Sequence, residues 1–147
     1  MKLNPDCLRD IMLTIEPIIC VEPAEENRKN LRKFNRVSVS GLAHKFSDAY
    51  SKEEVIYHIV QLSESGYILT DFTFNNVGML GYFRLGSIYH ITPKGHDFIA
   101  AIMEKRRWSA VSSVLKSFGA VSLTVIETVA KGVASAAIEE FQSSHPV

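Results

Sequence analysis

A predicted β-hairpin constrains the fold of this chain most. It consists of two strand-like segments joined by turn residues, with helical patterns before and after it. Polar and apolar side chains alternate over 67–74, and residues 82–91 are expected to form the returning strand. Between the two segments, Asn75, Asn76 and Gly78 supply turn chemistry. A shorter alternating stretch over 37–40 predicts a third strand. Helices combined with a small hairpin-based sheet indicate the α+β class.

Helix start and stop signals divide the rest of the chain. Four residues are expected to cap helix N-termini: Asn4, Ser51, Thr92 and Ser122. Three residues are expected to end or kink helices: Pro17, Gly66 and Gly119. Ser51 and Glu54 also have the spacing of a capping box, in which each side chain bonds the other residue's amide. The pattern after Thr92 allows one helix as far as Phe118, with Met103 facing inward.

The order of these elements predicts a winged helix-turn-helix, with a two-stranded β-hairpin wing and a C-terminal helical extension. The helix after Ser51 takes the place of the recognition helix, and residues 75–81 take the place of the wing tip. The winged-helix domain is expected to span 1–107, with a charged insert at about 22–36. Residues 108–147 form the extension, which is a candidate oligomerisation element.

Several segments of the sequence are more specific than these general patterns of secondary structure. They are residues 1–10 (MKLNPDCLRD), 50–58 (YSKEEVIYH), 66–67, 91–99 (ITPKGHDFI) with Trp108, and 118–123. Together they resemble the phage- and prophage-associated domain of unknown function 2513. The resemblance covers most of the chain and is weakest across 17–49. It implies a winged-helix-like fold and a phage or prophage association, and it carries no activity.

The charges are balanced in total and uneven along the chain. There are 16 Lys and Arg against 16 Asp and Glu, which argues against a nucleic-acid or anionic-membrane partner. Over 51–66, one Lys faces three Glu, so phosphates would repel the predicted recognition helix. Over 24–36, five basic residues outnumber two acidic ones. This segment is either a solvated helix or loop, or an anion-binding patch.

The acidic recognition helix and the charge-poor tail favour a protein that acts by protein–protein interaction. The last helix is expected to cover its own core or to pair with a second copy; its acidic Glu139 and Glu140 argue against a membrane. A dimer is the expected oligomer, and a host or phage protein is a further candidate partner. The candidate protein-interaction residues are Tyr57, His58, Gln61, Trp108, Ile126, Val129 and Val133.

A DNA-binding transcriptional regulator is the alternative hypothesis. It depends on two basic clusters, over 28–36 and 105–107, meeting in space as one contact surface. The candidate nucleic-acid-binding residues are Arg28, Lys29, Arg32, Lys33, Arg36, Arg84, Lys105, Arg106 and Arg107.

Nothing in the sequence indicates catalysis or a cofactor. The five His and two Cys lack metal-ligand spacing, and no phosphate loop or nucleophile elbow is present. Cys7 in a first helical turn is either a thiol of lowered pKa or a small buried residue. We expect a non-enzymatic, cytoplasmic protein, since no secretory signal and no membrane-spanning run is found.

Overall fold

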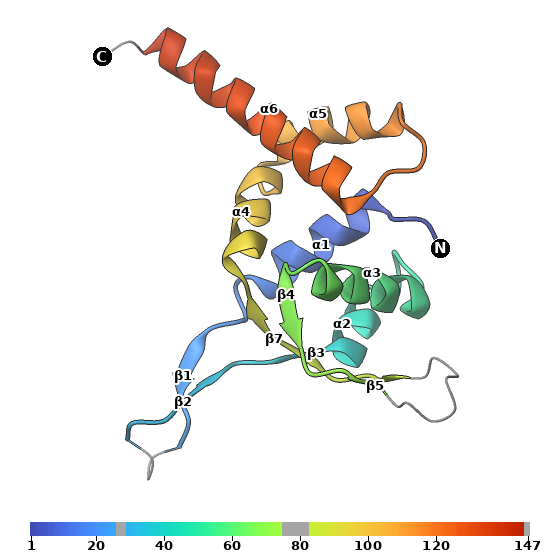
Figure 1. Ribbon diagram of the computed structural model, residues 1–147, viewed down its shortest axis with the longest axis vertical. Coiled ribbons are helices and arrows are strands. Elements are labelled where there is room, and N and C mark those ends of the chain that lie inside the picture. The colour runs from blue at the N-terminus through green and yellow to red at the C-terminus, as the bar shows by residue number, and fades with distance from the viewer. Residues whose placement is uncertain (26–28, 75–82, 146–147) are drawn as a thin grey trace.

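The computed structural model describes residues 1–25, 29–74 and 83–145. In these residues it has an α+β fold with small antiparallel sheets and a long C-terminal helix (Figure 1). The helices are α1 (Pro5–Ile15), α2 (Val39–Lys45), α3 (Lys52–Glu64), α4 (Pro93–Ile102), α5 (Lys105–Lys116) and α6 (Leu123–Ser144). The strands are β1 (Val21–Pro23), β2 (Arg32–Phe34), β3 (Val37–Ser38), β4 (Ile68–Thr70), β5 (Thr73–Phe74), β6 (Phe83–Arg84) and β7 (Ser87–Ile91).

The central sheet has the order β3-β7-β4, and both pairings are antiparallel. Val37 lies opposite Ile88, and Ile68 lies opposite Ile91. Each of the two long strands expected over 67–74 and 82–91 is interrupted, so that β5 and β6 pair separately beyond β4 and β7. The expected wing tip at 75–81 lies outside the described residues.

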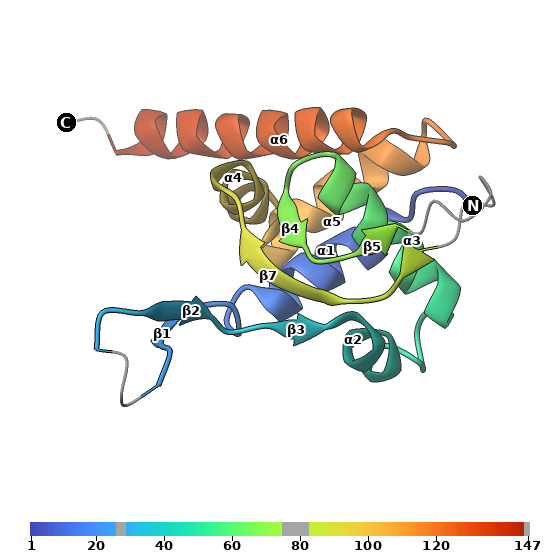
Figure 2. The same ribbon diagram turned by 60° about the horizontal axis from the view of Figure 1, so that its bottom comes forward.

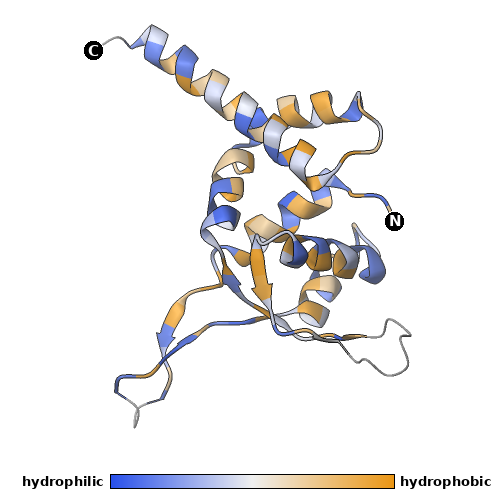
Figure 3. Ribbon diagram, viewed as in Figure 1, coloured by the Kyte–Doolittle hydropathy of each residue, from blue (hydrophilic) through white to orange (hydrophobic). Residues whose placement is uncertain are grey.

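The core lies between this sheet and the helices. α1 buries Leu8, Ile11, Met12 and Ile15, and α3 buries Val55, Ile59 and Leu62, as the helical spacing predicts. In Figure 3, β4 is strongly hydrophobic, whereas β2 is mainly hydrophilic. None of the helices in the described ranges combines the length and the apolar character that crossing a membrane requires.

All four predicted N-caps are confirmed. The side chains of Asn4, Ser51, Thr92 and Ser122 each accept a hydrogen bond from a backbone N–H of the first turn. Gly66 ends α3 with φ at 82°, and Gly119 follows α5 with φ at 74°. In the described part of the chain the Glu54 carboxylate does not close the expected capping box. It accepts a hydrogen bond from Asn4 Nδ2 at 3.1 Å instead and so ties α3 to α1.

The prediction of a single helix after Thr92 is wrong, because α4 ends at Ile102 and a separate helix, α5, begins at Lys105. The Glu104 carboxylate accepts hydrogen bonds from the backbone N–H groups of Arg106 and Arg107 and starts a new helix. Met103, which was expected to face inward, stands at this break and is 57% exposed. A cap made by Glu is less common than one made by Ser or Asn, which is why the sequence pattern missed it.

The charged insert contains a β-hairpin where the first of the two alternatives expected a solvated helix or loop; the second alternative, an anion-binding patch, does not depend on this difference. β1 and β2 pair antiparallel, with Val21 opposite Phe34 and Glu22 opposite Lys33. The Asn35 N–H donates to the Cys20 carbonyl at 2.8 Å and closes the base of the hairpin. Only three residues of each strand pair, which is too short for an alternation to stand out in the sequence.

α6 crosses α4 and α5 and then runs on beyond them (Figures 1 and 2). Its first half buries Leu123, Ile126 and Ala130. Between Lys131 and His145 no residue is fully buried. The helix therefore covers its own core with one half and presents the other half to solvent.

Candidate functional site

His58 does not lie on the exposed face of α3 that the sequence analysis assigned to it. Its side chain is 0% exposed. The Nε2 atom accepts a hydrogen bond from the Asn4 N–H at 2.7 Å, and Nδ1 lies 2.7 Å from the Glu54 carbonyl oxygen. Burial lowers the pKa of the His58 imidazole below its usual value and outweighs the opposing effects of Glu54. His58 is thus a neutral core residue.

The sequence did hold a signal for this burial. Residues 55, 58, 59 and 62 follow the i, i+3, i+4, i+7 spacing of a buried helix face, and all four are buried. Tyr57 and Gln61 lie at the border of this face and are partly exposed. The exposed residues of α3 include Lys52, Glu53 and Glu64, so its outer surface keeps an acidic excess.

Trp108 is buried against its own chain. Its Nε1–H donates to the Asp6 carboxylate at 2.8 Å, which joins α5 to α1. The Arg9 guanidinium lies 5.6 Å from the centre of the indole ring and also donates to the carbonyls of Ile102 and Met103. Trp108 and the buried Ile126 therefore hold the extension onto the rest of the fold.

The exposed half of α6 carries apolar side chains that the candidate residues did not include. Val129 and Val133 are partly buried, whereas Ile138 is 55% and Phe141 is 62% exposed. A groove of about 430 Å³ runs between this half of α6 and the start of α5. Its lining combines small and charged side chains from both helices: Arg106, Arg107, Ala110, Val133, Ala136, Ala137 and Glu140.

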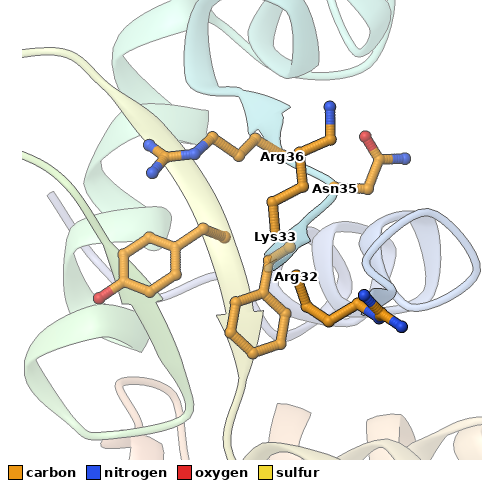
Figure 4. Close-up of a pocket in the computed structure, with 6 residues that line it drawn as sticks. Arg32, Lys33, Asn35 and Arg36 are labelled. Atoms are coloured by element: carbon orange, nitrogen blue, oxygen red, sulfur yellow. The ribbon is translucent and has the colours of Figure 1, made fainter. Parts of the chain in front are cut away.

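The basic residues of the insert gather at one side of the β1–β2 hairpin. A pocket of about 570 Å³ is lined by Arg32, Lys33, Phe34, Asn35, Arg36 and Tyr89 (Figure 4). Arg36 forms an ion pair with Asp71 at 2.5 Å and lies 5.4 Å from the centre of the Tyr89 ring. Of the other candidates, Lys29 and Arg84 are exposed, and Arg28 lies outside the described residues.

The two basic clusters do not form one surface. The β1–β2 hairpin projects from one end of the molecule, and α5 lies with α6 at the other end (Figure 1). The structure thus separates 29–36 from Lys105, Arg106 and Arg107.

The described part of the chain offers no built metal site, since no three His, Cys, Asp or Glu side chains in it come together. Cys7 is fully buried, and burial raises the pKa of its thiol to about 12, with smaller contributions from Glu54 and Asp10. This excludes the reactive-thiol alternative for Cys7 and confirms the small buried residue. His96 is exposed on α4.

One comparison with known families gives a match. The family model described as "Hypothetical protein (DUF2513)" matches residues 2–122. The chain belongs to this family. The matched region spans α1 to α5 and ends directly before α6. No curated protein and no solved structure matches the chain.

Proposed function

We propose that this member of the DUF2513 family is a non-enzymatic winged-helix protein of phage or prophage type that acts by binding other proteins. It self-associates through the C-terminal half of α6. The phage or prophage association comes from the family resemblance, and the mode of action comes from the geometry of the surface.

The winged-helix assignment is supported by the order of the elements. A helix, α1, and a short edge strand, β3, precede the helix pair α2 and α3. The antiparallel strands β4 and β7 follow, and their hairpin continues into β5 and β6. This is the succession that a helix-turn-helix with a β-hairpin wing requires.

The observation that carries self-association is the apolar end of α6. Ile138 and Phe141 are more than half exposed on a helix that has already left its own core. The neighbouring Ala134, Ala136 and Ala137 are small, which permits a second helix to approach closely. Monomeric surfaces rarely keep large apolar side chains together at such a place, so a second copy of the helix is the occupant that we propose.

The groove charges do not select an orientation for the pair. Glu140 lines the same groove as Arg106 and Arg107 of its own chain, so acidic and basic groups already lie together within one copy. An antiparallel pair is preferred because it places the C-terminal end of each α6 toward the N-terminal end of the other, where the helix dipoles attract.

Light scattering on the full chain at micromolar concentration tests the proposal. We expect a dimer for the wild type and a shift to monomer for the double variant Ile138→Ser with Phe141→Ser. Val21→Ser is the matched control, because Val21 is 60% exposed at the opposite end of the molecule and should leave the dimer intact. A monomeric wild type would contradict the proposal.

Duplex-DNA regulation through joined basic clusters receives less support. The clusters lie at opposite ends of the molecule, and the outer surface of α3 is acidic.

A further inference from the structure

The pocket between β2 and β7 combines cationic and aromatic side chains. Three cationic side chains, Arg32, Lys33 and Arg36, line it together with the rings of Phe34 and Tyr89. In Figure 4 the guanidinium groups of Arg32 and Arg36 lie well apart, with the Lys33 side chain between them. The positive charges are thus spread along the pocket.

Two of the three cations have no ion-pair partner among the described residues, although Lys33 lies opposite Glu22 in the hairpin register. Arg36 is held by Asp71 and covers Tyr89, so its role is accounted for. Arg32 donates to the backbone carbonyls of Lys29 and Leu31, which fixes its direction and leaves its charge unneutralised. Neither Arg32 nor Lys33 forms an ion pair with a carboxylate of the described residues.

Phe34 supplies a flat apolar surface beside these cations. Its ring packs at 4.7 Å, centre to centre, on His90 and at 6.4 Å on Tyr89, which fixes its orientation. The residue nevertheless stays 37% exposed. Since Val21, directly opposite in the hairpin, is 60% exposed, this face of the hairpin is not covered by the chain itself.

We propose that this pocket binds single-stranded nucleic acid. Arg32 and Lys33 contact the phosphates, and one unpaired base stacks on the ring of Phe34. Groups of this kind, a cationic groove with an aromatic platform, bind single strands without sequence preference. In a duplex the bases already stack on one another and are closed to Phe34, so only an unpaired base can use its ring as a platform.

Fluorescence anisotropy on the full chain tests the proposal. The probes are a labelled oligothymidine and an oligouridine of about 20 nucleotides, with a duplex of the same length as the third arm. We expect both single strands to bind more tightly than the duplex, and the two single-stranded arms tell DNA from RNA. Binding should weaken steeply between about 50 and 200 mM salt. An absence of binding at the lower salt, or equal binding of the duplex, would overturn the proposal.

Variants separate stacking from charge. Phe34→Leu should weaken single-strand binding by about tenfold, whereas Phe34→Tyr, which keeps an aromatic ring, should retain it. Arg32→Ala with Lys33→Ala should lower the salt dependence by about 1.4 in the log–log slope, at about 0.7 for each lost phosphate contact. All of these side chains are exposed in β2, so folding should not change.

The matched control is Lys105→Ala with Arg106→Ala, which removes two exposed cations from α5 at the other end of the molecule. We expect its single-strand affinity to equal that of the wild type. An equal loss in this control would mean that net charge alone drives binding, and an unchanged Phe34→Leu would mean that no base stacks there. Either result would overturn the proposal.

Discussion

The backbone N–H of Asn4 donates a hydrogen bond to Nε2 of the buried His58 side chain at 2.7 Å. The other ring nitrogen of His58 donates to the Glu54 carbonyl, so the imidazole is neutral, with its proton on Nδ1. Protonation of Nε2 would remove the acceptor of this contact and place a charge in the core. This link between the start of α1 and α3 therefore exists only while His58 stays neutral, whereas the second link, from Asn4 Nδ2 to the Glu54 carboxylate, does not depend on it.

Acid should weaken the fold through His58. Because its pKa in the folded state is lowered below 6.5, the unfolded chain binds more protons at mildly acidic pH. The stabilisation is complete above pH 6.5 and is lost as the pH falls through the lower pKa of the folded state. Urea unfolding at a series of pH values between neutral and mildly acidic checks this expectation.

His58→Gln isolates this contribution. A glutamine side chain keeps an acceptor for the Asn4 N–H and does not titrate, so the variant should lose part of the acid sensitivity. His96→Gln is the matched control, since His96 is exposed on α4, and its pH profile should follow that of the wild type. Identical profiles for His58→Gln and the wild type would show that other groups cause the acid sensitivity.

Removing the hydrogen bond between Trp108 and Asp6 should show how much this contact between α5 and α1 contributes to stability. Trp108→Phe removes the indole N–H and its 2.8 Å hydrogen bond to the carboxylate. Because Asp6 is exposed to water, we expect a loss near the lower end for charged hydrogen bonds, about 1.5 kcal/mol of the free energy of unfolding. A double-mutant cycle with Asp6→Ala checks this, and strictly additive losses would mean that the contact contributes nothing.

Gly95 should be intolerant of any side chain. A Cβ at this position in the first turn of α4 would overlap the Tyr67 carbonyl and approach Ile91 Cγ2 to 2.8 Å, and the carbonyl belongs to backbone that cannot move aside cheaply. We expect Gly95→Ala to lower the free energy of unfolding by about 1–3 kcal/mol. Gly132→Ala on the exposed side of α6 meets nothing within 4 Å and should raise stability by about 0.5–1 kcal/mol. Thermal unfolding of the two variants measures the contrast, and equal changes would contradict it.

Local rules predicted the helices well, because their signals lie within a few residues. The four caps, the stop at Gly66 and the buried faces of α1 and α3 all depend on short-range spacing. The break before α5 was missed, since it depends on Glu104 acting as a cap. The β1–β2 hairpin was missed because each strand pairs over only three residues.

The candidate site was harder to predict because it depends on contacts between residues that are far apart in the sequence. Tyr89 and Arg36 are brought together by the pairing of β3 with β7, which no local pattern encodes. The separation of the two basic clusters also depends on the path of α4 between them. The burial of His58 could have been predicted, because it lies on the same helical face as Val55 and Leu62. It was missed because histidine is polar and was therefore assigned to the exposed face.

Ser51 gives the most direct test of the cap that begins α3. Its hydroxyl oxygen accepts a hydrogen bond from the Glu54 N–H at 3.1 Å, and Ser51→Ala should cost about 1 kcal/mol of the free energy of unfolding. Ser109→Ala is the matched control, because Ser109 lies inside α5 on the exposed side, where Ala is the better helix former and should be neutral or stabilising by a few tenths of a kcal/mol. Urea unfolding with an unchanged m-value measures both. A Ser51→Ala variant as stable as Ser109→Ala would mean that the attachment of Glu54 to Asn4, and not the serine hydroxyl, holds the start of α3.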